Sequence, residues 1–197
     1  IGSGRTDAGV HALRQIANFH ADNTYNTDEI YKYINHYLPE DIAVHNVEAV
    51  DEQFHSRFNV SERHYQYKIW NGVHSNVFER KNSYWVKESL NIDKMSEAAE
   101  LLIGSHDFLG FSSKSKKKNT TKEIYNISIT SEGSMIIIDF YGEGFLYNMV
   151  RIIVGTLIEI GQSKKDSGVI QRIFTSTKLV ALFGLICVGL ESIPAHG

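Results

Sequence analysis

The chain has 197 residues, which is enough for one large domain or two small ones. Aromatic residues make up 11% of it and prolines number only two, which excludes disorder along the whole chain. The single cysteine, Cys187, excludes an internal disulfide and a cysteine-based metal cluster, and no run reaches the ~18 apolar residues that span a membrane. The net charge of −3 gives by itself no indication of a nucleic-acid partner.

Three elements are predicted before residue 51. Alternating apolar residues predict a strand over 15–20, and a less regular alternation predicts another over 42–50. Between them, Thr27 can cap a helix from 28 to 38, which Pro39 ends. The apolar positions of this helix follow the i, i+3, i+4, i+7 spacing: Ile30, Tyr33, Ile34 and Tyr37.

Strands and helices alternate through the rest of the chain. Residues 64–70 alternate regularly and predict a strand, and 124–130 and 135–141 predict an antiparallel hairpin around the turn 131–134. Together with the helices, this much antiparallel pairing predicts an α+β fold.

Three helices are predicted after residue 90. The first is capped by Asn91 or Asp93, runs through Ile103 and is ended by Gly104. The other two span 145–160 and 167–174, and the longer of them has an apolar stripe. Because the chain opens on a glycine-rich loop at Ile1 and stops on turn residues, we expect a fragment with elements missing on both sides.

The opening loop, Gly4-Arg5-Thr6-Asp7-Ala8-Gly9, places a carboxylate between glycines and near an arginine. Glycines allow a ligand to approach the backbone closely, and an arginine keeps a nearby carboxylate ionised. The spacing indicates either a reactive carboxylate or a turn in which Asp7 caps a following amide.

Basic and aromatic residues are interleaved in Phe54-His55-Ser56-Arg57-Phe58 and again in Arg63-His64-Tyr65-Gln66-Tyr67. Guanidinium groups bind phosphates and aromatic rings stack on unpaired bases, so this pattern is typical of RNA binding. The alternative is an amphipathic strand whose aromatic residues belong to the core.

Arg151 lies in the strongly apolar segment from Phe145 to Gly155. A buried arginine there needs a carboxylate partner, whereas an arginine at the edge of the helix would extend to solvent. The lysine run 116–118 is typical of a solvated loop. The nine histidines are dispersed and phosphate-binding glycine motifs are absent, so we expect no metal, no nucleotide cofactor and no other cofactor.

Together these stretches resemble the tRNA pseudouridine synthase A family. The match is specific from Gly4 to Ala12 and continues, in the family's order, to about residue 175. The supporting motifs are Phe54-His55-Ser56-Arg57-Phe58, Arg63-x-Tyr65-x-Tyr67, His106-Asp107-Phe108 and Phe145-x-x-x-Met149-Val150-Arg151-x-Ile153-Val154-Gly155.

The resemblance implies isomerisation of uridine to pseudouridine in the anticodon stem-loop of tRNA, at tRNA positions 38 to 40. It implies that Asp7 is the catalytic aspartate, that Arg151 pairs with it and that Tyr65 stacks on the target base. Arg5 matches an arginine linked to RNA and to opening of the base stack. We also expect Arg14, His55 and Arg57 to bind RNA.

The family further implies two ferredoxin-like halves with antiparallel sheets flanked by helices, a homodimer and a tRNA partner. We expect residues 1–58 to form part of the N-terminal half, with the catalytic loop, and 59–197 the C-terminal half. The expected compartment is the cytoplasm, with no membrane association. Two alternatives stay open: a catalytically inactive RNA-binding fragment, and a small-molecule enzyme that uses the Asp7 loop.

Overall fold

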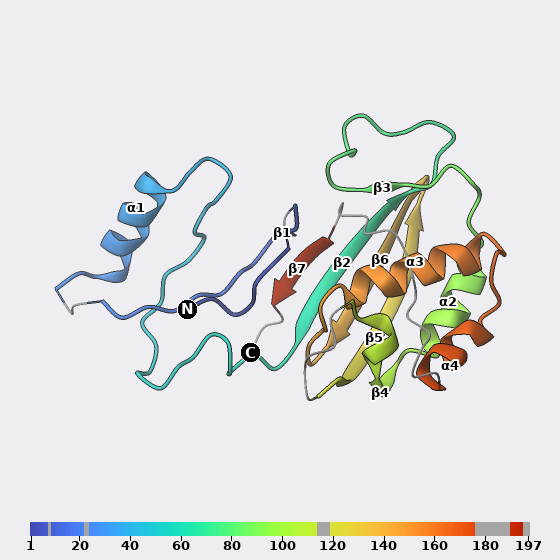
Figure 1. Ribbon diagram of the computed structural model, residues 1–197. Coiled ribbons are helices and arrows are strands. Elements are labelled where there is room, and N and C mark those ends of the chain that lie inside the picture. Colours follow the sequence, from blue (N-terminus) through green and yellow to red (C-terminus); the bar gives the residue numbers. More distant parts are fainter. Residues whose placement is uncertain (8, 22–23, 114–118, 176–189, 195–197) are drawn as a thin grey trace. The chain divides into compact units, whose positions relative to one another are not determined.

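The computed structural model of the chain describes residues 1–7, 9–21, 24–113, 119–175 and 190–194 (Figure 1). They form two compact units. Unit 1 comprises 1–4 and 16–59, and unit 2 comprises 5–15 together with the chain from 60 onward. The opening loop therefore groups with the later part of the chain rather than with its sequence neighbours.

Unit 1 contains one helix, α1 (Thr27–Tyr37), which confirms the predicted helix. Its cap is Asn26 rather than Thr27. The Asn26 side chain accepts a hydrogen bond from the Glu29 amide, and the Glu29 carboxylate accepts one from the Asn26 amide. Because this reciprocal capping box satisfies two backbone donors, the helix begins one residue earlier than expected.

The two strands predicted in unit 1 are wrong. Of residues 15–20, only Ala17 forms a bridge, to Gly2, in a short ladder with the first residues of the chain. Residues 42–50 form no strand. The amide and carbonyl of Val44 bond to the side chain of Asn35 in α1, at 2.9 Å each. A side chain thus takes the backbone partners that a neighbouring strand would have supplied.

Unit 2 is built on a seven-stranded mixed sheet, which confirms the α+β class. The strand order is β1-β7-β2-β6-β5-β4, and β3 pairs with the end of β2. The central strand β2 is antiparallel to both β6 and β7, whereas β1 is parallel to β7. The strands are β1 (His11–Ala12), β2 (Arg63–Trp70), β3 (Tyr84–Trp85), β4 (Gly104–Asp107), β5 (Thr121–Glu132), β6 (Met135–Gly142) and β7 (Leu190–Pro194).

The predicted hairpin is confirmed as β5 and β6, and both strands are longer than expected. They pair up to Glu132 and Met135, which leaves a two-residue connection at Gly133 and Ser134. Gly133 has φ +60°, which glycine adopts without strain. The tight turn therefore lets the ladder continue through two of the four residues expected to form the loop.

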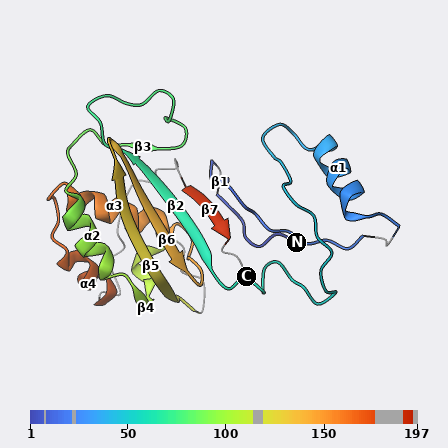
Figure 2. The same cartoon turned by 180° about the vertical axis from the view of Figure 1, so that it is seen from behind.

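Helices cover one face of this sheet, as both views show (Figures 1 and 2). They are α2 (Ile92–Glu100), the 3-10 helix η1 (Phe108–Phe111), α3 (Met149–Gly161) and α4 (Gly168–Thr175). The core lies between them and the sheet, with Phe108, Phe140, Met95 and Leu157 fully buried. Asn91 caps α2 as one of the two predicted caps, but the helix ends at Glu100 and not at Ile103.

The start of α3 differs from the prediction. Residues 145–148 are not helical, and the helix begins at Met149 because Asn148 is in the left-handed region with φ +59°. A non-glycine residue in that conformation cannot continue a right-handed helix. Arg151 consequently lies in the first turn of α3, rather than in its second turn as the predicted start at 145 would have placed it.

The structure adds elements that the sequence did not predict: β1, β3, β4, η1 and β7. Each has two to five residues, too few for a periodic pattern to show. The lysines at 114–118 and nearly all of the apolar stretch 179–190 lie outside the described residues. Within the described part of the chain, none of the helices has the length and apolar character needed to cross a membrane.

Candidate active site

The opening loop makes a turn at Asp7, which brings Val10 to the core of unit 2. The Asp7 carbonyl accepts a hydrogen bond from the Val10 amide at 3.1 Å, and Gly9 between them has φ +77°. Val10 then packs against the hydrophobic core. A side chain at position 9 would be strained in this conformation, so the glycine lets the chain turn sharply at Asp7.

Arg151 faces this loop from the first turn of α3. Its side chain is 6% exposed, and its Nε lies 3.6 Å from Oδ2 of Asp7, whose side chain is 40% exposed. This distance makes an ion pair and is too long for a hydrogen bond. The prediction of a buried arginine with a carboxylate partner is confirmed, and the alternative of an arginine extended to solvent is wrong.

The pair is asymmetric in its access to water. The guanidinium is almost wholly buried, where an uncompensated charge would be costly. The carboxylate keeps two fifths of its side chain exposed, so a ligand can reach it. The carboxylate of Asp7 is therefore open to solvent and is paired with a buried cation.

Tyr65 lies in β2 and packs against the core from the same unit. Burial raises the pKa of its phenol above the ordinary value of 10.0; Arg63 lowers it and Asp7 raises it. The charge on Asp7 is thus close enough to act on the Tyr65 hydroxyl. Asp7, Arg151 and Tyr65, predicted as catalytic residues from three separate stretches, come together in unit 2.

The predicted RNA-binding residues divide between the units. Arg5 and Arg14 are both exposed and lie in the segment 5–15 of unit 2. His55 and Arg57 belong to unit 1, where the Arg57 amide donates to Nδ1 of His55 at 3.2 Å. The centroids of the His55 and Phe58 rings lie 4.2 Å apart, and the rings are tilted by 30°. This turn is anchored to Ile1, whose carbonyl accepts from the Ser56 hydroxyl. Their contact with RNA stays a prediction.

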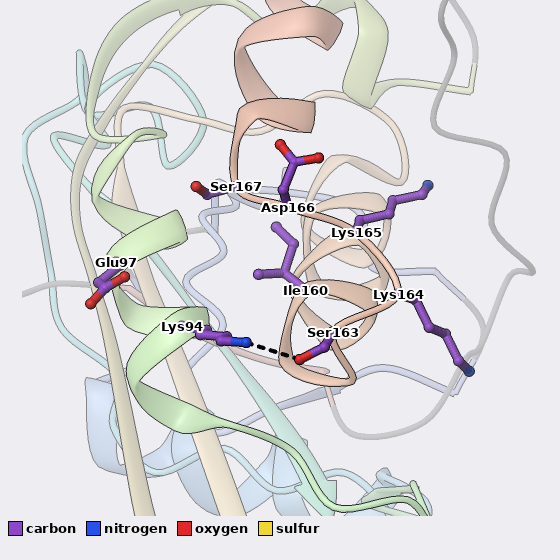
Figure 3. A pocket seen from close by; sticks show the side chains of 8 residues that line it. All are labelled: Lys94, Glu97, Ile160, Ser163, Lys164, Lys165, Asp166 and Ser167. Carbon is purple, nitrogen blue, oxygen red and sulfur yellow. Dashed lines mark hydrogen bonds between the residues drawn. The ribbon is translucent and has the colours of Figure 1, made fainter.

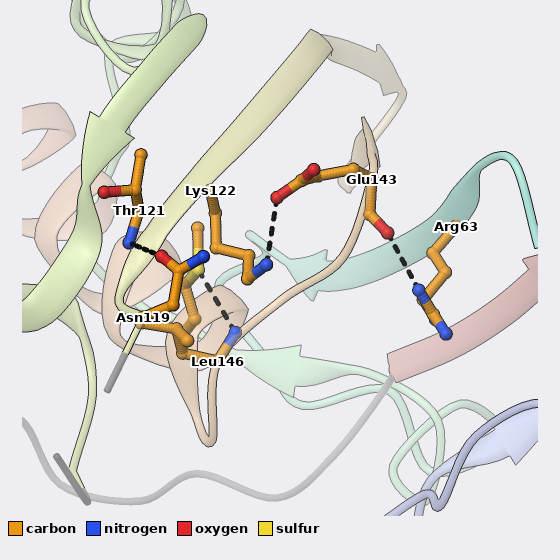
Figure 4. A network of polar contacts seen from close by, with 7 residues as sticks. Arg63, Asn119, Thr121, Lys122, Glu143 and Leu146 are labelled. Carbon is orange, nitrogen blue, oxygen red and sulfur yellow. Dashed lines mark hydrogen bonds and ion pairs between the residues drawn. The ribbon is translucent and has the colours of Figure 1, made fainter. Parts of the chain in front are cut away.

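A polar network around Glu143 was not predicted from the sequence as part of the site (Figure 4). The backbone carbonyl of Glu143 accepts from Nη1 of Arg63 at 2.8 Å, and its carboxylate pairs with Lys122 at 2.9 Å. The signal in the sequence is a charged residue between two glycines, Gly142 and Gly144, at the end of an apolar strand. It marks a tight turn directly before the segment that carries Arg151.

A separate pocket of about 460 Å³ lies between α2 and the loop that joins α3 to α4 (Figure 3). Its lining carries both signs of charge, from Lys94, Lys164 and Lys165 and from Glu97 and Asp166. The Lys94 ammonium donates to the Ser163 hydroxyl at 3.0 Å. None of the predicted site residues lines this pocket, so it does not belong to the Asp7 site.

Metal-ligating side chains do not gather in the described ranges: no group of three or more His, Cys, Asp or Glu residues there could hold a metal ion. The chemistry available at the Asp7 site is that of a carboxylate, a guanidinium and a phenol. The carboxylate can act as nucleophile or base, the guanidinium can support its negative charge, and the phenol can transfer a proton.

An α+β protein whose solvent-accessible carboxylate is backed by a buried arginine is equipped for nucleophilic or acid–base chemistry on a bound substrate. The family model described as "tRNA pseudouridine synthase" matches residues 1–59 and 98–184. The chain therefore belongs to the tRNA pseudouridine synthase family, a class of isomerases, and the resemblance predicted from the sequence is confirmed.

Curated relatives agree with this assignment. The chain is 49% identical over 174 residues to a "tRNA pseudouridine synthase A 2" of Bacillus cereus, covering 88% of this chain and 71% of the relative. It is 49% identical over 167 residues to "tRNA pseudouridine synthase A" of a Bacillus species, covering 84% and 68%. The protein of the same name from Geobacillus kaustophilus is 43% identical over 165 residues, covering 83% and 64%.

Proposed function

We propose that this chain converts uridine to pseudouridine at positions 38 to 40 of the tRNA anticodon stem-loop, with Asp7 as the catalytic carboxylate. The observation that carries the proposal is the Asp7–Arg151 pair beside Tyr65, in a chain that belongs to this family. The reaction conserves the atoms of the nucleoside apart from exchange of hydrogen with water, so it requires neither an oxidant nor a group donor.

Asp7 starts the reaction. The bond between C1′ of the ribose and N1 of uracil breaks, the base rotates, and a bond forms between C1′ and C5. The carboxylate attacks C1′ or C6, or assists a glycal route, and each of these needs an anionic oxygen within reach of the nucleotide. The hydrogen on C5 leaves to water, and N1 gains a proton.

Arg151 and Tyr65 support this step in different ways. The buried guanidinium offsets the negative charge of the carboxylate in a site from which a bound base excludes water. The phenol ring of Tyr65 stacks on the uracil, and its hydroxyl assists removal of the C5 proton. Because burial raises its pKa, the phenol is protonated at neutral pH, so it relays the proton: its oxygen accepts the C5 proton while its own proton passes to water.

The tRNA is held outside the reacting centre. Arg5, Arg14, His55 and Arg57 contact phosphates or unpaired bases, and the target base leaves its stack at a cost of a few kcal/mol. By family relationship we also propose two ferredoxin-like halves, 1–58 and 59–197, a homodimeric assembly and a cytoplasmic location. Binding should weaken steeply with added salt, since each neutralised phosphate steepens the logarithmic salt dependence by roughly 0.7 to 0.9.

Tritium release from tRNA labelled at uridine C5 tests the proposal. Asp7→Asn should lose turnover by on the order of 10³-fold or more while tRNA affinity stays within about two-fold, because the amide keeps the shape and lacks the nucleophilic charge. Asp166→Asn is the matched control, since Asp166 also pairs with an arginine, Arg172. It should retain full turnover.

The outcomes separate the alternatives. An Asp7→Asn variant that keeps a tenth of the rate would exclude Asp7 as the catalytic carboxylate. Binding of tRNA by the unmodified chain with no tritium release would support an inactive RNA-binding fragment. An absence of tRNA affinity at low salt would favour the small-molecule enzyme.

A further inference from the structure

The turn between β6 and α3, residues 143–148, adjoins both Tyr65 and Arg151 of the candidate site. It follows directly on Gly142, the partner of Arg63 in the β2–β6 ladder, and it leads into the helical turn that carries Arg151. The turn therefore connects Arg63, two residues before Tyr65, with the helical turn that carries Arg151.

Glu143 fixes the first part of the turn at three points. Its amide donates to the carbonyl of Glu123 at 3.1 Å, its carbonyl accepts from Arg63, and its carboxylate pairs with Lys122 (Figure 4). Gly142 allows this approach, because a Cβ there would lie 2.7 Å from the Glu123 carbonyl oxygen. The backbone is therefore clamped to β5 and to the start of β2, two residues before Tyr65.

Phe145 is the side chain that this clamped turn presents to Tyr65. The two ring centroids lie 5.1 Å apart with an interplanar angle of 85°, which is an edge-to-face contact. Both rings are partly buried and pack against the core. The contact leaves Tyr65 supported by an aromatic ring on one side.

The second part of the turn is also fixed. The Leu146 side chain is buried, and its amide donates to Sδ of Met149 at 3.4 Å. The Asn148 side chain donates to the Ser113 hydroxyl at 2.8 Å. Phe145 thus lies between two anchored ends, in a segment with little freedom to give way.

We propose that Phe145 is a positioning residue that holds the Tyr65 ring in the orientation needed to stack on the target base. This inference rests on the proposed function only for the role of Tyr65 in turnover; the support of one ring by the other is a property of the folded chain. A ring that must stack on an extruded base gains from being oriented before the base arrives, because a misplaced group costs rate rather than affinity.

The test is Phe145→Leu, which keeps an apolar side chain and removes the aromatic edge. We expect kcat for tritium release to fall about ten-fold, with KM for tRNA within about two-fold. Phe174→Leu is the matched control, since Phe174 is also partly buried and makes an edge-to-face contact, with Phe108 at 5.4 Å and 80°. It should leave kcat unchanged.

A second readout does not depend on turnover. Loss of the Phe145 ring opens Tyr65 to water and should lower its pKa toward the ordinary value, since burial is the largest cause of the present shift. The change is followed by tyrosinate absorbance, and the Tyr65 contribution is assigned by subtracting the titration of Tyr65→Phe.

The outcomes are distinct. A lower Tyr65 pKa in Phe145→Leu and not in Phe174→Leu, with the fall in kcat, supports the inference. Unchanged kcat and an unchanged Tyr65 pKa overturn it, and so does an equal loss of kcat in the two leucine variants. If the unmodified chain releases no tritium, the proposed function fails and the Tyr65 titration alone decides whether Phe145 holds the ring.

Discussion

The helices α1 and α3 show how differently two predicted helices can be stabilised. In α1 none of the residues is buried, and Tyr33 and Tyr37 are about two-thirds exposed. In α3, 11 of 13 residues are buried, Arg151 among them. The first helix is defined by its cap and its local spacing, whereas the second is held by packing around most of its circumference.

This contrast extends to the units that contain the helices. Every fully buried apolar side chain among the described residues belongs to unit 2. A functional group is placed accurately when its supporting side chains cannot shift, and close-packed cores supply that rigidity. The location of Arg151 in α3 therefore explains how the partner of Asp7 is kept in position.

The largest expected effect is on stability, when an apolar side chain is truncated in α3 rather than in α1. Leu157→Ala in α3 should lower the free energy of unfolding by about 2–5 kcal/mol, because Leu157 is fully buried. Ile34→Ala, on the half-buried side of α1, should cost less than about 1 kcal/mol. Urea unfolding of unit 2 is followed by tryptophan fluorescence, since Trp70 and Trp85 both lie there, and that of α1 by the loss of helicity in circular dichroism. Equal losses would contradict the contrast.

Next in size is the loss of the buried cation. Arg151→Met keeps an unbranched apolar stem in α3 and should lower turnover at least about 100-fold, while the half-exposed Asp7 stays hydrated and stability changes little. Arg172→Met removes an equivalent charge from an exposed pair with Asp166 and serves as the control. Comparable turnover in the two methionine variants would show that the burial of Arg151 has no functional role.

The same contrast explains what could be predicted from the sequence. The elements β2, β5, β6, α2 and α3 carry regular apolar spacing, because each buries one face or more, and all were predicted. The pattern at 42–50 also alternates, but Asn35 provides partners for the backbone of Val44 and no strand forms. Strands of two to five residues, such as β1 and β7, exist only through their pairing with distant segments.

The site was predictable in its parts and not in its arrangement. The spacing around Asp7 left both a turn and a reactive carboxylate open, and the structure shows that the residue does two things: its carbonyl closes a turn while its carboxylate meets Arg151. Phe145 was placed inside a predicted helix, so the turn that aims it at Tyr65 could not be anticipated. The left-handed conformation of Asn148, which moves the start of α3, has no periodic signature.

A smaller effect should distinguish the two capping residues. Asn26 and Asn91 make the same side-chain hydrogen bond to the amide three residues on, at 2.9 Å in each helix. Replacing either by alanine should cost about 1 kcal/mol of helix stability. For Asn91→Ala this should appear in the unfolding of unit 2, whereas for Asn26→Ala it should appear as lost helicity by circular dichroism with unchanged tryptophan-detected unfolding. A shift of the tryptophan transition in Asn26→Ala would show that α1 unfolds together with unit 2.

The smallest effect concerns the Tyr65 phenol and appears only in alkali. Burial holds its pKa above the ordinary value of 10.0 in the folded chain. Well below that pH the phenol is protonated in both the folded and the unfolded state, so its titration does not change the free energy of unfolding. Above it the unfolded state loses the proton first and binds fewer protons than the folded state, so stability falls as pH rises.

Tyr65→Phe removes this contribution, and its unfolding free energy should therefore decline less steeply than that of the unmodified chain between roughly pH 9 and pH 11. Urea titrations at the two pH values, followed by tryptophan fluorescence, measure the difference. Parallel declines would mean that the phenol is as accessible to water in the folded chain as in the unfolded one, and the close support of its ring by Phe145 would then have no energetic consequence.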